Sequence, residues 1–298
     1  MIGVELVKLV RRPRTWISLT LTCALPFIVA VFIAVTHLTP PPGQGSAFLS
    51  AVLQSGALYP AAALAMVLPV FLPIATAVVA GDSIAGEATT GTLRYLLVRP
   101  VGRTRLLVAK LISVTSYVVL VVVAVTVTAY ATGVLLLGPS QAGAVAHSIG
   151  PGSTPVSGVG APTAGVSPGA GAVTSLSGTP LSLLQLAERT VGAIAFIAVS
   201  MLGVAAIALF LSTITSSALG AALGALAALV ASEILVTLNA AAVIQPYLPT
   251  RYWLAWIDFF RDPIFWRNID RGFAIQAVYV VVFLGAAWAN FSTKDITA

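Results

Sequence analysis

Long apolar runs, separated by short polar segments, are the dominant pattern along the chain. Because about 20 apolar residues cross the hydrocarbon core of a bilayer, six of these runs predict membrane-spanning helices. The runs cover residues 16–36, 58–80, 106–137, 183–211, 218–244 and 273–291. The second run contains Pro60, Pro69 and Pro73 and is therefore expected to be bent. The pattern predicts an all-α, polytopic membrane protein that forms a single domain over residues 1–298.

Residues 1–15 combine basic and apolar side chains ahead of the first apolar run. Ile2, Leu6, Leu9 and Val10 recur at i, i+4, i+7 and i+8, which places them on one face of a helix. A basic amphipathic helix of this kind binds the anionic cytoplasmic leaflet. We therefore expect an interfacial amphipathic helix here, and a simple cytoplasmic tail is the alternative.

The composition excludes the soluble classes of protein. Hydrophobic residues make up 58% and charged residues 8% of the 298 residues, whereas soluble domains carry about 25% charged residues. The net charge of +6 lies on residues that flank apolar runs, as membrane orientation requires, so nucleic acid is not an expected partner. The single Cys23 provides neither a disulfide framework nor a thiol metal cluster, and no metal site is expected.

The distribution of Lys and Arg predicts the orientation in the membrane. With six spans, the N-terminus, residues 81–105, residues 212–217 and the C-terminus share one side. That side carries ten Lys and Arg residues, against five on the other side. The positive-inside rule places the first side in the cytoplasm. We expect both termini to be cytoplasmic.

Two segments on the opposite side have unusual compositions. Residues 138–180 contain no Lys, Arg, Asp or Glu and are rich in Gly, Pro, Ser and Thr, so we expect a flexible extracytoplasmic loop over residues 138–181. Residues 245–271 interleave aromatic and charged side chains, a pattern that suits the headgroup region. Short interfacial or re-entrant helices are expected in that segment.

The motifs of common enzyme classes are missing from the sequence. It contains no GxxxxGK[ST] phosphate loop, no HExxH and no GxSxG, so we expect no catalytic residues and no cofactor in this chain. The clearest intramembrane charge is Glu233, near the middle of the fifth run, with Asn239 two turns further on. A carboxylate at that depth is costly. Both residues are candidates for a substrate path, and a structural hydrogen bond of Glu233 is the alternative.

The fifth run also carries a stripe of small residues. Gly220, Gly224 and Ala228 recur at a spacing of four residues, the pattern that lets membrane helices approach closely. The stripe predicts either packing within one chain or the seam of a dimer.

Residues 81–105 form a short charged interruption between the second and third apolar runs. After the acidic residues Asp82 and Glu87, Thr92 can cap a new helix. The apolar face of that helix consists of Leu93, Leu96 and Leu97. We expect two short helical pieces across the cytoplasmic mouth of the flanking spans, and an ordinary solvated loop is the alternative.

This segment resembles the signature of ABC-2 permeases, the membrane subunits of ABC-type exporters that include drug-, antibiotic- and polysaccharide-exporting systems. The matching motifs are Gly86-Glu87, Gly91-Thr92-Leu93, Leu96-Leu97 and Pro100-Val101-Gly102-Arg103, with Lys110 opening the third span. The N-terminal amphipathic helix, the six-span layout and Asp295 near the C-terminus also agree with the family. The long uncharged segment 138–180 is a departure from it.

The resemblance implies a permease that exports a substrate, such as a drug, a lipid or another amphipathic molecule, across the plasma membrane by alternating access. A separate ATPase subunit would bind ATP and Mg and would seat residues 81–105 as a coupling helix. The residues implied to contact that subunit are Asp82, Glu87, Thr90, Gly91, Thr92, Leu93, Arg94, Leu96, Leu97, Arg99 and Arg103.

Further partners follow from the same resemblance. They are membrane lipids and a second permease chain, in a homodimer or a heterodimer. Two other functions remain open at this point: a membrane scaffold or assembly protein, and an ion-coupled secondary transporter that uses Glu233.

Overall fold

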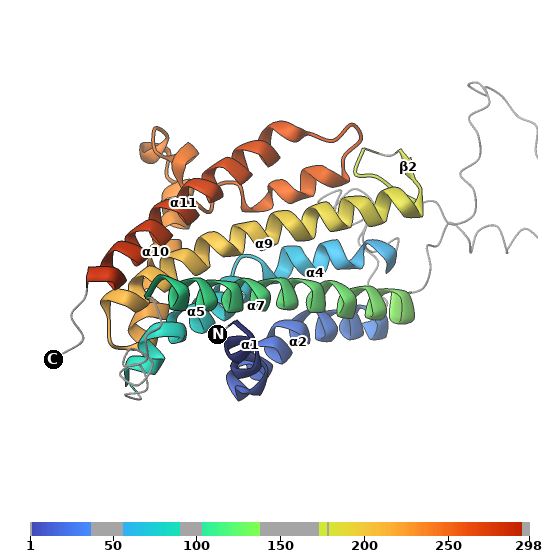
Figure 1. Ribbon diagram of the computed structural model, residues 1–298. Coiled ribbons are helices and arrows are strands. Elements are labelled where there is room, and N and C mark those ends of the chain that lie inside the picture. Colours follow the sequence, from blue (N-terminus) through green and yellow to red (C-terminus); the bar gives the residue numbers. More distant parts are fainter. Residues whose placement is uncertain (1, 37–55, 90–102, 138–172, 178, 294–298) are drawn as a thin grey trace, which may run out of the picture.

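The helices run along one direction in a bundle, with most connections at its two ends (Figure 1). The computed structural model describes residues 2–36, 56–89, 103–137, 173–177 and 179–293. Its α-helices are α1 (Ile2–Arg11), α2 (Pro13–Thr36), α4 (Tyr59–Val67), α5 (Phe71–Thr89), α7 (Arg103–Thr132), α9 (Leu183–Ile214), α10 (Ala218–Thr237) and α11 (Trp266–Thr293).

Shorter elements complete the description. A 3-10 turn, η1 (Gly56–Leu58), precedes α4, and a π-helical turn, η2 (Gly133–Leu137), extends α7. Three more 3-10 segments lie between α10 and α11, namely η3 (Asn239–Ala241), η4 (Gln245–Tyr247) and η5 (Trp253–Phe260). Strands β1 (Val173–Thr174) and β2 (Pro180–Leu181) pair antiparallel in a small hairpin before α9.

The structure confirms an all-α polytopic membrane protein. Among the described residues, five helices are long and apolar enough to cross a bilayer, and a sixth span results if the bent pair Gly56–Val67 and Phe71–Glu87 is one span. The two members of that pair meet at an angle of 59°. Pro69 lies in the break between them, where its ring and missing N–H interrupt the helix. The predicted bend of the second span is therefore confirmed.

Helix α9 forms the centre of the bundle and packs against α5, α7, α10 and α11. Small residues allow the closest of these approaches. A Cβ atom on Gly81 of α5 would lie 3.0 Å from the backbone nitrogen of Ala222 and 3.2 Å from the backbone oxygen of Ala218, both on α10. Only glycine lets the two backbones meet at this distance, because backbone atoms cannot move aside as a side chain can.

Helix α5 overturns the prediction of a loop that begins at residue 81. The helix continues to Thr89, so the first third of the 81–105 segment is helical. Ser212 of α9 stabilises this extension, since its hydroxyl accepts a hydrogen bond from the Ala85 N–H at 2.8 Å and donates one to the Gly81 carbonyl at 2.7 Å. The polar residues in this stretch mark the end of a long helix with buried partners.

The hairpin overturns part of a second prediction. Residues 138–172 lie outside the described residues, but the end of the expected flexible loop is folded. Leu181 is buried, the N–H of Leu176 donates to the carbonyl of Phe260, and the Thr179 hydroxyl donates to Asp262 at 2.9 Å. The composition of the loop did not reveal these contacts with a distant segment.

Residues 245–271 contain the short helical segments that their pattern predicts. Several of their aromatic side chains are buried against α9 and α11 and are not turned outward. The buried rings are those of Trp253, Trp256, Phe259 and Phe260. The last residues of this stretch belong to α11, which begins at Trp266, earlier than predicted.

Candidate functional site

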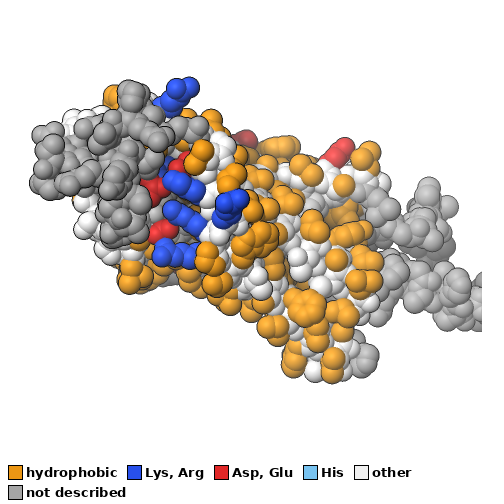
Figure 2. Space-filling model, turned by 60° about the horizontal axis from the view of Figure 1, so that its bottom comes forward, with side chains coloured by type: hydrophobic (Ala, Val, Ile, Leu, Met, Phe, Trp, Pro, Cys, Tyr) orange, Lys and Arg blue, Asp and Glu red, His pale blue; other side chains and the backbone are white. Residues whose placement is uncertain are grey.

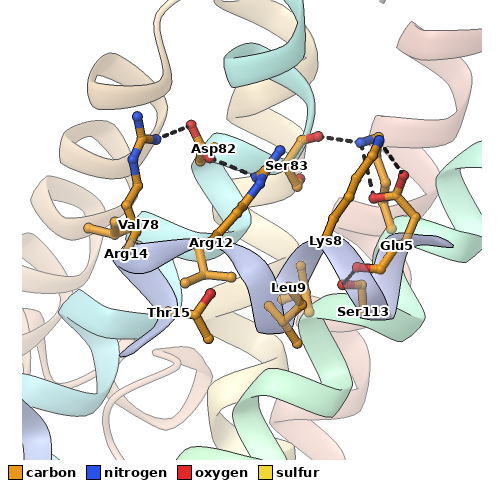
Figure 3. A pocket seen from close by; sticks show the side chains of 13 residues that line it. Glu5, Lys8, Leu9, Arg12, Arg14, Thr15, Val78, Asp82, Ser83 and Ser113 are labelled. Carbon is orange, nitrogen blue, oxygen red and sulfur yellow. Dashed lines mark hydrogen bonds and ion pairs between the residues drawn. The ribbon is translucent and has the colours of Figure 1, made fainter. Parts of the chain in front are cut away.

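Oppositely charged side chains converge where α1, α5 and α7 meet (Figure 3). We call this group the charge cluster. Its cationic members are Lys8, Arg12, Arg14 and Lys110, and its anionic members are Glu5, Asp82 and Glu87. Figure 2 shows red and blue side chains gathered at one end of a surface that is otherwise mostly hydrophobic. We call this the charged end of the bundle, and the opposite end the hairpin end.

Helix α1 contributes to the cluster with its charged face, whereas sequence analysis predicted only that this amphipathic helix lies on the membrane surface. Glu5 is 8% exposed and points inward, whereas Ile2 and Val10 are exposed. Of the four predicted apolar-face residues, Leu9 is the buried one. The apolar face that was predicted to contact the membrane is therefore split, with Ile2 and Val10 on the outside of the protein and Leu9 on the inside. The stripe that does face inward is polar, because Glu5, Lys8 and Arg12 follow one another at i, i+3 and i+7.

The centre of the cluster is the ion pair between Glu87 of α5 and Lys110 of α7. Their Oε2 and Nζ atoms lie 2.7 Å apart, and the two side chains are 4% and 1% exposed. Lys110 also donates to the Ser83 carbonyl at 2.5 Å and lies 3.6 Å from Glu5. Lys8 closes the group with 3.1 Å contacts to both Glu5 and Glu87. Buried charges are tolerated when they are paired and hydrogen-bonded in this way.

Asp82 joins α5 to the start of α2. Its two carboxylate oxygens accept hydrogen bonds from Arg12 at 2.9 Å and from Arg14 at 2.6 Å. Gly86, one turn further along α5, leaves room for this carboxylate, because a Cβ atom at residue 86 would overlap the Asp82 side chain. The Gly-Glu motif therefore has a local physical reason, since the glycine frees Asp82 and the glutamate pairs with Lys110.

The neighbouring carboxylates favour the charged form of Lys8. Burial disfavours the ammonium group of Lys8, but hydrogen bonds and attraction from Glu87 and Glu5 outweigh it and raise the pKa of Lys8 above its usual range. A cavity of about 40 Å³ lies among these side chains. Sites for small molecules usually measure about 300–1,000 Å³, so this cavity does not accommodate a transported substrate. The geometry suits a structural junction between three helices.

The structure describes only part of the predicted ATPase contact. Asp82 and Glu87 lie on α5 and pair within the chain, and Arg103 is the first residue of α7. The remaining members, Thr90, Gly91, Thr92, Leu93, Arg94, Leu96, Leu97 and Arg99, lie outside the described residues. Their contact with another subunit stays a prediction. The segment that holds them connects α5 to α7, the two helices that the Glu87–Lys110 pair joins.

The candidates for a substrate path do not come together on one helix. Helix α10 ends at Thr237, so Glu233 lies in its last turns and not in the middle of a span. Its side chain is exposed. Asn239 belongs to η3, after the end of α10, and is also exposed. A carboxylate near a helix end can reach the interface at lower cost than one at the bilayer centre, so the depth argument for Glu233 is weakened.

The small-residue stripe of α10 faces mostly outward. Gly220 and Ala228 are exposed and Gly224 is intermediate, with Leu211 of α9 beside it. The face of α10 that packs within the chain is a different one, formed by Ala221, Ala222, Ala225, Leu229 and Ser232. Of the two uses predicted for the stripe, packing within one chain applies to Gly224 alone.

Sequence analysis missed Lys8, Arg12 and Arg14 as partners of the acidic residues of α5. It also missed Glu5 as a partner of Lys8 and Lys110. The signal was present in the spacing of Glu5, Lys8 and Arg12, but a basic amphipathic helix explained those residues without a tertiary contact. Glu87 and Lys8 are separated by 79 positions, and no local pattern reports a pairing over that distance.

The charge cluster lies in the part of the chain that matches a known protein family. A family model described as ABC-2 family transporter protein matches residues 1–150. The matched stretch includes α1, α2, α4, α5 and α7 and with them every member of the charge cluster. A comparison with curated proteins gave no match.

Proposed function

The chain belongs to the ABC-2 transporter family, and from this premise we propose that it is the permease subunit of an exporter whose spans are moved by a separate ATPase subunit. Membership makes the chain a membrane permease of an ABC transporter, a class that associates with an ABC ATPase. The coupling segment, the direction of transport and the dimer are parts of the proposal. ATP and Mg would be bound by the ATPase subunit and not by this chain.

The observation that carries the proposal is the junction at the base of the connecting segment. Residues 90–102 run from α5 to α7, and Glu87 and Lys110 hold those two helices together at 2.7 Å. The same pair is tied to α1 through Lys8 and Glu5. A force applied to residues 90–102 by a partner would therefore act on three helices as one body. A docking segment needs such a base in order to transmit motion to the spans.

The proposed orientation follows the charge. The charged end of the bundle would face the cytoplasm of the cell membrane, since Lys and Arg are enriched on the cytoplasmic side of membrane proteins. The end of α11 lies at that end (Figure 1), and α1 carries Glu5 and Lys8 of the charge cluster. A second permease chain would complete the transport path, and the exposed stripe of Gly220 and Ala228 is the proposed seam.

The test is co-purification of the full chain with a candidate ABC ATPase subunit, chosen by its phosphate-loop motif from the genes beside this one. Leu96→Glu places a charge on the predicted apolar docking face and is expected to abolish co-purification of the ATPase. Glu188→Ala is the matched control, because Glu188 is exposed in the first turns of α9 at the hairpin end. The control should retain the ATPase. Retention of the ATPase by both variants would remove residues 90–102 from the proposed interface.

A further inference from the structure

The outward face of α1 forms an open, shallow groove whose lining combines apolar and basic side chains. The groove has a volume of about 530 Å³, and its lining consists of Gly3, Val4, Val7, Lys8, Arg11, Arg12 and Pro13. Val4 and Val7 are 60% and 52% exposed. The lining contains three basic side chains and no acidic one. The groove therefore suits a ligand that is apolar along its length and anionic at one end.

We propose that this groove binds an anionic phospholipid, with its phosphate at Arg11 and its acyl chain along Val4 and Val7. Arg11 is the important cation, because Lys8 and Arg12 already pair with acidic residues of the cluster. Within the described part of the chain, no ion pair involves Arg11. A guanidinium with free donors matches the geometry of a phosphate group.

The position of the groove favours a lipid over a soluble ligand. Helix α1 leads directly into the membrane span α2 at Pro13, so the groove ends where the surface of a membrane span begins. The first turns of α2 expose Trp16 and Ile17. Tryptophan is enriched at the boundary between headgroups and acyl chains, and the Trp16 indole donates to the Val10 carbonyl at 2.7 Å. Arg11, which precedes this boundary in the chain, therefore lies at the depth of lipid phosphates.

The inward orientation of Glu5 and Lys8 explains why the groove exists. If α1 turned its charged stripe outward, Glu5 would repel an anionic headgroup. The charge cluster draws this carboxylate inward, so that Glu5 is only 8% exposed, and leaves Val4, Val7 and Arg11 on the outside. The site goes beyond the proposed function, because it requires neither an ATPase nor a transported substrate.

The first test uses the wild-type full chain in phosphatidylcholine vesicles that contain a photoactivatable phosphatidylglycerol with its reactive group in the acyl chain. Cross-linking is expected within residues 3–10, mapped by mass spectrometry. Unlabelled phosphatidylglycerol should compete, whereas extra phosphatidylcholine or inorganic phosphate should not. Competition by inorganic phosphate would indicate a simple anion site and would overturn the lipid assignment. A loss of labelling as the chain is packed more densely would show that a second copy covers the groove, with the same consequence.

The second test removes the charge of Arg11. Arg11→Gln should lower the preference of the groove for phosphatidylglycerol over phosphatidylcholine by about fivefold, which corresponds to about 1 kcal/mol per basic residue at an anionic surface. Arg105→Gln is the matched control, since Arg105 is an exposed basic residue at the start of α7, outside the groove. Equal losses in both variants would indicate a general surface potential and would overturn the site.

Discussion

Replacement of Lys110 by methionine tests whether the charge cluster is a buried ionic junction. Lys110 is 1% exposed, and its Nζ atom contacts Glu87 at 2.7 Å, Glu5 at 3.6 Å and the Ser83 carbonyl at 2.5 Å. Removal of one partner from a buried pair destabilises proteins by about 3–5 kcal/mol. Because Lys8 remains 3.1 Å from Glu87, we expect Lys110→Met to lower the free energy of unfolding by about 3 kcal/mol, at the lower end of that range.

The assay is unfolding by denaturant in bicelles, followed by far-UV circular dichroism. Lys8→Met is the matched control, because Lys8 contacts the same carboxylate but its side chain is 37% exposed. Exposed pairs contribute at most about 1 kcal/mol. A double-mutant cycle with Glu87→Gln then isolates the pair, and the double variant should be more stable than the sum of the two single effects predicts, by about 2 kcal/mol.

Two results would refute this reasoning. If Lys110→Met and Lys8→Met have equally small effects, burial does not strengthen the Lys110 pair. If the effects of Lys110→Met and Glu87→Gln simply add, the two side chains do not interact in the folded protein, and their ion pair does not join α5 to α7.

Three further predictions concern α1, α5 and α10. Since folding raises the pKa of Lys8 above 10.5, the stabilising contribution of Lys8 is complete below that value and is lost as the pH rises through the higher pKa of the folded protein. A spin label at residue 3, introduced by Gly3→Cys in a Cys23→Ser background, should therefore keep constant mobility near neutral pH and gain mobility only in strong alkali. A change in mobility near pH 7 would contradict this prediction. Gly81→Leu should destabilise the protein by about 1–3 kcal/mol, because the new side chain would meet the backbone of α10. The control Gly285→Leu should leave the unfolding midpoint unchanged, because a Cβ atom at residue 285 has no neighbour within 4 Å. Equal unfolding midpoints for the two variants would exclude the close approach of α5 and α10. Gly220→Leu should leave the stability of the single chain unchanged but weaken its self-association in light scattering, and undiminished association would exclude this stripe as a dimer seam.

The spans and the bend could be predicted because they depend on local properties of the chain. A run of apolar residues needs no partner to be recognised as a span, and Pro69 interrupts a helix wherever it occurs. The predicted and observed limits of the fourth span agree at Leu183 for the same reason, since Ser182 and Gln185 form a capping box there.

The candidate site could be predicted only in part, because its contacts are long-range. Glu87 and Lys110 were recognised as residues of a motif, but their pairing depends on how α5 and α7 meet. The orientation of α1 illustrates the same limit. Apolar residues surround most of this short helix, so its sequence permits more than one inner face, and the acidic residues of α5 select the one that carries Lys8. The continuation of α5 to Thr89 likewise depends on Ser212, more than 120 positions away.

The charge cluster also explains how α1 can hold a fixed position without crossing the membrane. Apolar surface drives helix association in water, but between helices in lipid that driving force is small. Helix α1 exposes Val4, Val7 and Val10, so its apolar side chains do little to attach it to the bundle. Lys8 and Glu5 attach α1 instead, because they contact Glu87 and Lys110, the buried ion pair of the two helices that the 90–102 segment connects. If a partner subunit displaces that segment as proposed, the displacement must either carry α1 with it or break ion pairs, and α1 would then move with α5 and α7.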